Sequence, residues 1–213
     1  MGQEPARAKG GHNRIHGLIN LAIQNFVTDS YGPQMWQAVA HAARLPDAGI
    51  EAMLRYDLTL TEAVLGAACT ALNQTPDALL EDLGTYLVSH PNTEVLRRLL
   101  RFGGVNFLEF LHSLDELPGR AQLAVEDLDM PQIELVDLGR GEFRLNVRSP
   151  IAGFAPVMMG VLRAMADDYG ALVLIAPVGR HGDGAYIAIT LLDSSFAAGR
   201  GFALAAGGAG GGG

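Results

Sequence analysis

The side chains best able to bind a metal or carry out catalysis in this chain are one cysteine and six histidines. The sequence contains no H-E-x-x-H, C-x-x-C, P-loop or G-x-S-x-G motif, so it lacks the usual signatures of zinc, dithiol, phosphate and acyl-transfer sites. Cys69 lies in the apolar run 63–69, where a small buried hydrophobic residue is expected. Isolated histidines are by default hydrogen-bonded structural residues. The chain is therefore predicted to be a binding module and not an enzyme.

Composition narrows the class of binding partner. The 213 residues carry a formal net charge of -8, which disfavours a nucleic-acid partner because phosphate binding needs a concentrated basic face. Arg97, Arg98 and Arg101 do cluster, and they form either a solvated or salt-bridged face or a docking patch for a partner. The chain has no run of about 18 apolar residues and no apolar leader at its start, so a cytoplasmic protein without a membrane span is expected.

The first half of the chain has the periodicity of helices. Residues 1–14 are polar and are expected to form a flexible extension. Apolar residues at three- and four-residue steps then predict helices over 15–26, 33–44, 61–73 and 76–87. Thr75 is expected to cap the fourth helix, because its hydroxyl can accept a backbone N–H of the first turn.

The segment 104–120 is the most informative one in the sequence. Its apolar residues recur at helical spacing and predict one buried face, formed by Phe107, Phe110, Leu111, Leu114 and Leu117. Pro118 and Gly119 follow directly and are expected to end the helix.

After this segment the period changes from helix to strand. Strands are predicted over 133–138 and 142–147, joined as a hairpin, and over 172–175 and 185–192. A long helix is predicted over 153–169. The expected fold class is α+β, with an N-terminal helical subdomain followed by a four-stranded antiparallel sheet that carries one long helix. We expect one domain over 15–192, with a helical part 15–125 and a sheet part 131–192, and a flexible Gly/Ala-rich tail over 193–213.

Four segments of the chain resemble the H-NOX (heme NO/oxygen-binding) family. They read IHGLIN, YGPQMWQAV, LLEDLGTYLVSH and RRLLRFGGVNFLEFLHSLDELPGR, and the resemblance extends over about residues 15–192. It implies the H-NOX fold and a sensor role in nitric oxide signal transduction. It also implies a signalling partner, such as a separately encoded histidine kinase or nucleotide cyclase.

The resemblance also locates the positions that hold heme in the family, and several are substituted here. The histidine that binds iron in the family corresponds to Pro118, whose side chain has no lone pair to donate. The propionate-binding Tyr-x-Ser-x-Arg motif reads 147–151 here, with Val147 and Ile151 in place of Tyr and Arg and only Ser149 retained. Arg148 follows Val147 within this motif but is expected to point to the opposite face of the strand. A sensor without conventional heme is therefore predicted.

Ten residues are expected to line the pocket by resemblance: Ile19, Ile23, Leu87, Leu114, Pro118, Pro131, Val147, Ser149, Ile151 and Met158. The pocket would bind an apolar small molecule or nothing. One alternative is a heme-based gas sensor with unusual iron ligation, for which His90 and His112 are the candidate ligands. Another alternative is a ligand-free interaction domain that keeps only its partner surface.

Overall fold

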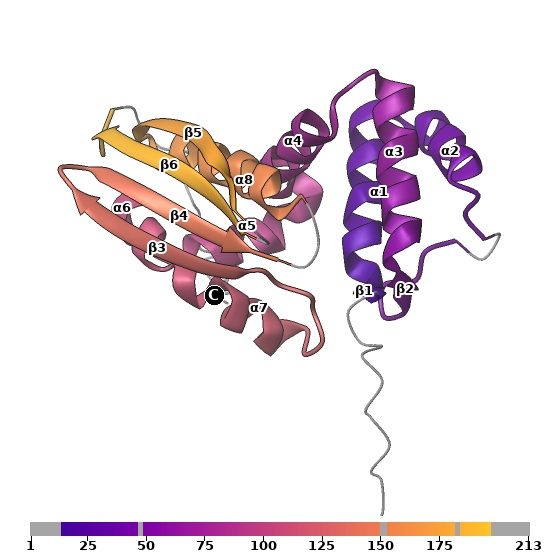
Figure 1. Cartoon of the computed structure of the whole chain (residues 1–213), viewed down its shortest axis with the longest axis horizontal. Coiled ribbons are helices and arrows are strands. Elements are labelled where there is room, and N and C mark those ends of the chain that lie inside the picture. Colours follow the sequence, from indigo (N-terminus) through magenta and orange to yellow (C-terminus); the bar gives the residue numbers. More distant parts are fainter. Residues whose placement is uncertain (1–13, 47–48, 150–152, 182–183, 197–213) are drawn as a thin grey trace, which may run out of the picture.

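The computed structural model describes residues 14–46, 49–149, 153–181 and 184–196. Its first part is mostly helical (Figure 1). The elements of this part are β1 (Arg14–His16), α1 (Gly17–Tyr31), α2 (Pro33–Ala42), β2 (Arg55–Asp57), α3 (Leu58–Leu72) and α4 (Pro76–Ser89). The four predicted helices are therefore present, with ends shifted by a few residues. The predicted cap of α4 is confirmed, because the hydroxyl of Thr75 accepts the backbone N–H of Ala78 at 3.3 Å.

Two short strands, which the sequence did not predict, directly precede the two longest helices of this part. Strands β1 and β2 pair antiparallel, with Ile15 opposite Tyr56. Each strand leads directly into a helix whose first turn is capped by a side chain. His16 Nδ1 accepts the backbone N–H of Leu18 at 3.2 Å, and Asp57 Oδ1 accepts that of Thr59 at 3.0 Å. The strand pair thus sets α1 and α3 side by side, starting from the same end (Figure 1).

The second part of the chain contains short helices, a sheet and one long helix. Its elements are the 3₁₀ turn η1 (Pro91–Thr93), α5 (Glu94–Arg101), α6 (Phe107–His112), the 3₁₀ turn η2 (Leu114–Glu116), α7 (Leu117–Ala124), β3 (Gln132–Gly139), β4 (Glu142–Arg148), α8 (Phe154–Tyr169), β5 (Leu172–His181) and β6 (Gly184–Asp193). The four strands form an antiparallel sheet in the order β3-β4-β6-β5. This confirms the predicted α+β architecture.

The prediction of one helix over 104–120, ended by Pro118 and Gly119, is wrong. The segment is divided into α6, η2 and α7, and Pro118 lies in the first turn of α7. A proline has no N–H to donate to the carbonyl four residues earlier, here Leu114, and its ring clashes with that carbonyl. An α-helix cannot run unbroken through this point, whereas proline is well tolerated in a first turn. Pro118 therefore lies in the first turn of a new helix, and the break comes before it.

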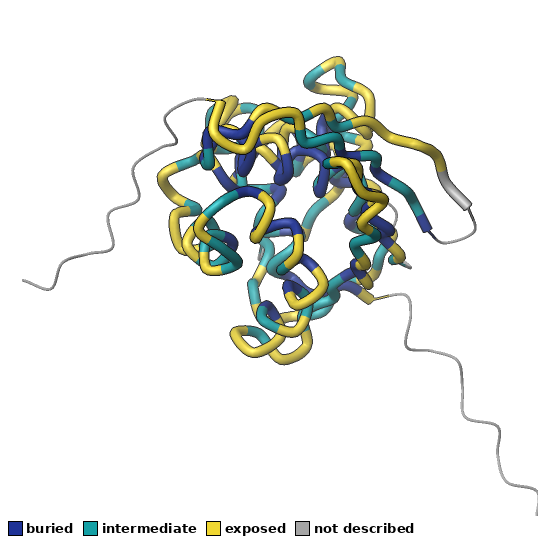
Figure 2. The backbone as a smooth tube through the Cα atoms, turned by 90° about the vertical axis from the view of Figure 1, so that its left-hand side faces the viewer, coloured by how far each residue is buried: buried dark blue, intermediate teal, exposed yellow. Residues whose placement is uncertain are grey.

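The buried residues form two hydrophobic cores. The sheet core lies between the sheet, α8 and the segment 104–120. It contains the predicted buried face of that segment, Phe107, Phe110, Leu111, Leu114 and Leu117, together with Phe143, Leu145, Val147, Met158, Leu162, Met165, Ile187 and Ile189. The helical core lies among α1 to α4 and contains Ile23, Phe26, Val27, Val39, Val64, Ala68, Leu79, Leu83 and Tyr86. Figure 2 shows the resulting distribution, with buried residues inside and exposed residues along the outer turns.

Helix α4 connects the two cores because it contacts α8 on one side and α1 and α3 on the other. Its contact with α8 is a backbone-to-backbone crossing at Gly84 and Gly160. A Cβ on Gly84 would collide with the carbonyl of Val157, and one on Gly160 would collide with that of Glu81. Glycine is required at both positions because no side chain fits between the two helices.

Candidate ligand site

The residue at the expected iron-ligand position is held in a short helix that lies against the edge of the sheet. Pro118 is partly buried in the first turn of α7, beside Leu117, which is 5% exposed. The preceding turn is tied to β3 because Asp115 Oδ1 accepts the backbone N–H of Leu135 at 2.8 Å. The position is therefore fixed to the sheet, and its side chain offers no lone pair.

The corresponding region of β4 is apolar on its inner face. Val147 is 3% exposed and pairs with Ile133 on one side and Ala185 on the other. Arg148 is exposed, as expected for the neighbouring residue of a strand. Ser149 is partly buried. Ile151, the last predicted position of this motif, lies outside the described residues.

The other expected pocket residues are divided between the two cores. Leu114 and Met158 belong to the sheet core with Val147, whereas Ile23 belongs to the helical core and Leu87 packs against it. Val157 contacts both cores. Of the remaining two positions, Ile19 is partly buried on α1 and Pro131 is buried just before β3.

The two alternative histidine ligands have different surroundings. His112 is exposed on α6 and lies edge-on to the ring of Phe143, with 5.9 Å between ring centroids. His90 follows α4 and stacks on Tyr86 at 4.8 Å. Its Nδ1 accepts the backbone N–H of Asn92 at 3.3 Å and lies 3.6 Å from a carboxylate oxygen of Asp29.

Asp29 is the centre of a polar cluster that sequence reasoning missed. Its Oδ2 accepts the hydroxyl of Tyr86 at 2.6 Å and the side-chain amide of Asn92 at 2.9 Å. The Tyr86 hydrogen bond, followed by that of Asn92, holds the pKa of Asp29 below its usual value. Burial, together with the neighbouring carboxylate, raises the pKa of Tyr86. Nothing in the spacing of these residues signals the cluster, because Asp29 is 57 residues from Tyr86 in sequence.

A cavity of about 310 Å³ adjoins this cluster, between α1, α4 and η1. It is lined by Leu18, Leu21, Ala22, Asn25, Asp29, Tyr86, Leu87, Asn92 and Thr93. Leu87 is the one predicted pocket residue among them. We refer to this cavity below as the α1–α4 groove.

A second cavity of similar volume lies along α3. It is lined by residues that include Leu65 and Cys69 of α3, Leu80 of α4, and Gly153. Cys69 was expected to be buried but is only partly buried. This partial burial raises the pKa of its thiol. A raised pKa keeps the thiol protonated, so it is neither a strong nucleophile nor a strong metal ligand at neutral pH.

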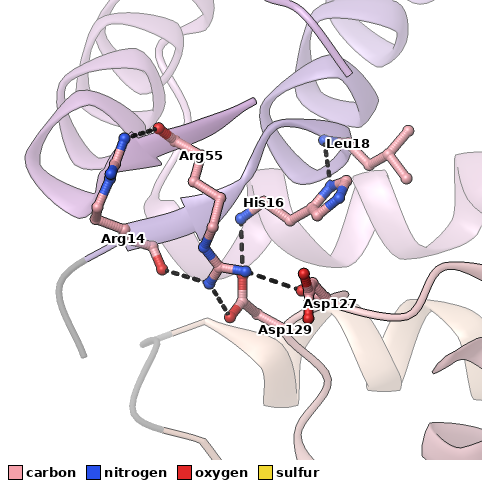
Figure 3. Close-up of polar contacts among 6 residues, drawn as sticks. All are labelled: Arg14, His16, Leu18, Arg55, Asp127 and Asp129. Atoms are coloured by element: carbon pink, nitrogen blue, oxygen red, sulfur yellow. Dashed lines mark hydrogen bonds and ion pairs between the residues drawn. The ribbon is translucent and has the colours of Figure 1, made fainter. Parts of the chain in front are cut away.

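The two parts of the chain are joined by a set of polar contacts around one guanidinium group (Figure 3). Arg55 on β2 donates to the carboxylate of Asp129 at 2.7 Å and to the carbonyls of Asp127 and Arg14, each at 2.9 Å. The other oxygen of Asp129 accepts the backbone N–H of His16 at 2.7 Å. We refer to these contacts as the Arg55 clamp. It ties the β1–β2 pair to the loop that precedes β3.

The arginine cluster on α5 is a salt-bridged face. Arg97 and Arg101 both pair with Asp168, whose side chain is 2% exposed. Arg101 also lies over the ring of Tyr169, 4.0 Å from its centroid, and Arg98 pairs with Glu94 one turn away. Of the two predicted roles for these arginines, the structure favours the salt-bridged face, which holds α5 against the end of α8.

A family model described as Haem-NO-binding matches residues 16–176 of this sequence. The chain belongs to this family. Its structure is also similar to solved H-NOX proteins. The similarity to a mutant H-NOX protein from S. oneidensis in the Fe(II) ligation state has a TM-score of 0.73 at 15% identity and covers 85% of this chain and 98% of that one. An Fe(II) unliganded H-NOX protein from K. algicida gives a TM-score of 0.70 at 14% identity, with 84% and 98% covered. At such identities these likenesses establish the H-NOX fold.

Curated relatives of the chain are much longer proteins. Soluble guanylate cyclase gcy-31 of Caenorhabditis elegans is 22% identical over 154 residues, which are 72% of this chain and 22% of that protein. Soluble guanylate cyclase 89Da of Drosophila melanogaster is 19% identical over 164 residues, which are 77% and 25%. The chain thus spans about a quarter or less of these relatives.

The family assignment confirms the predicted class of protein. H-NOX domains are heme-binding sensor domains of gas and nitric oxide signalling, are not themselves catalytic, and work with cyclase or kinase partners. Among the described residues, no helix is both long and apolar enough to cross a membrane.

Proposed function

We propose that this chain is an H-NOX sensor domain that works without a histidine-ligated heme and regulates a separate kinase or cyclase. The proposal rests on Pro118, which lies in the first turn of α7 and corresponds, by resemblance, to the family's iron ligand. Proline cannot bind iron in any rotamer or protonation state.

The surroundings of this position also do not fit the family cofactor. An anionic heme needs cationic or hydroxyl groups for its propionates, because charge-assisted hydrogen bonds hold those carboxylates. Val147, at the position of the family tyrosine, is a buried apolar side chain in the sheet core. Arg148 is exposed, whereas Val147 beside it is buried. The residues at the positions of the family's iron-binding histidine and propionate-binding tyrosine, Pro118 and Val147, can thus make neither of these contacts.

The alternative of unusual iron ligation has less support. The Nδ1 atom of His90 accepts a backbone N–H, so in the neutral ring the proton is on Nε2, and Nε2 has no lone pair for a metal while that hydrogen bond is made. His112 is exposed on α6 and lies against Phe143. Within the described part of the chain, no group of three or more His, Cys, Asp or Glu side chains could hold a metal ion without heme.

The cofactor part of the proposal is tested by heme loading. The chain is produced with ample heme supplied, purified by gel filtration, and examined for a Soret band at about 400 nm. We expect heme far below one equivalent per chain. A stoichiometric band that persists through gel filtration would overturn the proposal, and the variants His90→Ala and His112→Ala would then identify the ligand.

The partner and location are proposed from family membership. We propose a histidine kinase or nucleotide cyclase as the partner, and the cytoplasm as the location. Purified chain is added to candidate kinases and cyclases from the source cell, and autophosphorylation or cyclic-nucleotide formation is measured. A change that requires the folded chain supports regulation. Binding to the partner without any change in its activity would favour a ligand-free interaction domain instead.

A further inference from the structure

We infer that the α1–α4 groove binds a small protonated amine with an apolar body. This inference deepens the proposed sensor function by naming a class of ligand. Its biological meaning rests on that function, whereas binding itself does not.

The shape of the groove fits an elongated ligand. Leu18 and Asp29 mark its ends on α1, and the eleven residue steps from one to the other correspond to about 16 Å at 1.5 Å per residue. Its volume of about 310 Å³ is at the lower end of the range for small-molecule sites. A ligand with one ring or a short alkyl chain is therefore the appropriate size.

One end of the groove is apolar. Leu18, Leu21 and Ala22 line it on α1, and Leu87 adds an apolar side chain to the groove from α4. Leu18, Leu21, Ala22 and Leu87 are all partly exposed, although the opposite face of α1 is fully buried in the helical core. Covering these side chains would remove apolar surface from water, which favours a ligand with an apolar body.

The other end carries a fixed negative charge. Asp29 is the only charged residue among those that line the groove. Tyr86 and Asn92 both donate to its Oδ2, which fixes the orientation of the carboxylate, while Oδ1 accepts no hydrogen bond from a described residue. An ammonium group can donate to Oδ1 without displacing either of the existing donors.

Two helix ends add to this negative potential. Asp29 lies in the last turn of α1, which ends at Tyr31, and Leu87 lies in the last turn of α4, which ends at Ser89. The C-terminus of a helix carries a partial negative charge that favours a nearby cation. Neither helix has a basic residue in its last turn. The titratable group beside the carboxylate is His90, the residue that follows α4, whose Nδ1 lies 3.6 Å from Asp29 Oδ2 and accepts the backbone N–H of Asn92.

These features exclude the other ligand classes. An anion would be repelled by Asp29 and by both helix ends. A neutral apolar molecule would cover the carboxylate without compensating its charge, which is costly. A bare metal ion would find one carboxylate, whereas Ca²⁺ takes six to eight oxygen ligands. An organic cation satisfies the charge and the apolar wall together.

Three probes of similar shape and different charge test the inference on the full chain: 2-phenylethylamine, 2-phenylethanol and 3-phenylpropionate. Binding is measured by calorimetry at neutral pH. We expect the amine to bind at least about tenfold more tightly than the alcohol, and the carboxylate not to bind. Equal binding of amine and alcohol, or no binding of the amine at millimolar concentration, would overturn the inference.

Variants then locate the site. Asp29→Asn removes the charge while keeping the size of the side chain, and Ala22→Phe fills the apolar end without touching the Asp29 cluster. Each should weaken amine binding at least about tenfold. Asp167→Asn makes the same change of charge at an exposed position on α8 and should leave binding unchanged. Circular dichroism confirms folding of each variant. Full binding by folded Asp29→Asn or folded Ala22→Phe, or an equal loss in Asp167→Asn, would place the amine elsewhere.

The Soret absorbance of the same samples distinguishes failure of the amine-binding inference from failure of the heme-free sensor proposal. Failure of amine binding in a heme-free protein removes this inference and leaves the proposed function intact. A stoichiometric Soret band removes the heme-free sensor, whatever the amine does.

Discussion

The region around Pro118 and the α1–α4 groove differ in how far the protein's own side chains bury their apolar residues. Near Pro118 in sequence, Leu114 and Leu117 are buried in the sheet core, as is Val147 on β4, each at most 5% exposed. In the groove, by contrast, apolar side chains remain partly exposed, and a carboxylate keeps one oxygen without a described partner. A concave apolar surface that ends in one oriented charge is typical of ligand sites, whereas a filled core is typical of structure. Among the described residues, the comparison therefore favours the groove over the expected heme position around Pro118 as the place where this domain binds a small molecule.

The largest effect is expected from restoring the heme position. The triple change Pro118→His, Val147→Tyr and Ile151→Arg should convert a protein without heme into one with a stoichiometric Soret band. The imidazole supplies the iron bond, and the tyrosine and arginine supply hydrogen bonds to the propionates, worth about 1.5–3 kcal/mol for each contact to a charged group. Heme content is measured by absorbance after gel filtration.

Two controls make the restoration informative. Pro118→Ala removes the proline without adding a ligand and should bind no heme. Val147→Tyr alone enlarges a buried side chain and should cost about 1–3 kcal/mol in stability, so folding of the triple variant must be verified. A folded triple variant without heme would show that the sheet core has been rebuilt beyond the ligating residues.

The second prediction compares one leucine from each region. Leu162 is fully buried in the sheet core, and Leu162→Ala should lower the free energy of unfolding by about 2–5 kcal/mol, because it leaves a cavity. Leu21 lines the groove and is partly exposed, so Leu21→Ala should cost less than about 1.5 kcal/mol. Denaturant unfolding measures both. Similar losses would mean that the groove wall is part of a core and not an open ligand surface.

The third prediction concerns the Arg55 clamp, which joins the two parts of the chain. Arg55→Ala removes several hydrogen bonds to charged and carbonyl oxygens, but 34% of the side chain is exposed and water weakens the ion pair. We expect a loss of about 1–2 kcal/mol in the free energy of unfolding. Arg98→Ala, at an exposed i,i+4 pair on α5, should cost only about 0.3–0.5 kcal/mol. Equal losses in the two variants would show that the clamp does not hold the parts together.

Local patterns were sufficient to predict most of the fold. The helices of the first part, the hairpin β3–β4, the long helix α8 and the buried face of the central segment follow from periodicity and capping, which depend on near neighbours in sequence. Strands β1 and β2 were missed because each has only three residues, too few for an alternating pattern. The break before Pro118 was misplaced because a proline can either end a helix or start one.

The site was less predictable because it depends on contacts between distant residues. The positions of the heme motif came from resemblance, and the structure places Val147 and Leu114 in one core and Ile23 in the other. The Asp29 cluster brings together residues separated by 57 and 63 positions. No spacing rule connects such residues, so only the packing of α1 against α4 and η1 reveals the groove.

The smallest predicted effect concerns the acid end of the pH–stability curve. Hydrogen bonds from Tyr86 and Asn92 hold the folded pKa of Asp29 below its usual value of 3.8. A lowered folded pKa means that the unfolded chain binds the proton more readily, so stability falls as the pH is lowered. The contribution of Asp29 is fully present above pH 3.8 and is lost as the pH falls through the folded pKa.

The variant Asp29→Asn isolates this contribution. At about pH 7 it should be less stable than the wild type, and on acidification to about pH 2 the two curves should converge, because the protonated aspartic acid then resembles the amide. The pKa of Asp57 is also lowered, by its hydrogen bonds from Thr59, but this group titrates in both proteins and cancels in the difference. Asp167→Asn, on the exposed face of α8, should keep the slope of the wild type. Urea unfolding at a series of pH values measures the difference in free energy of unfolding between the wild type and Asp29→Asn. A difference that stays constant down to about pH 2 would show that Asp29 is not the oriented, ionised group that the groove requires.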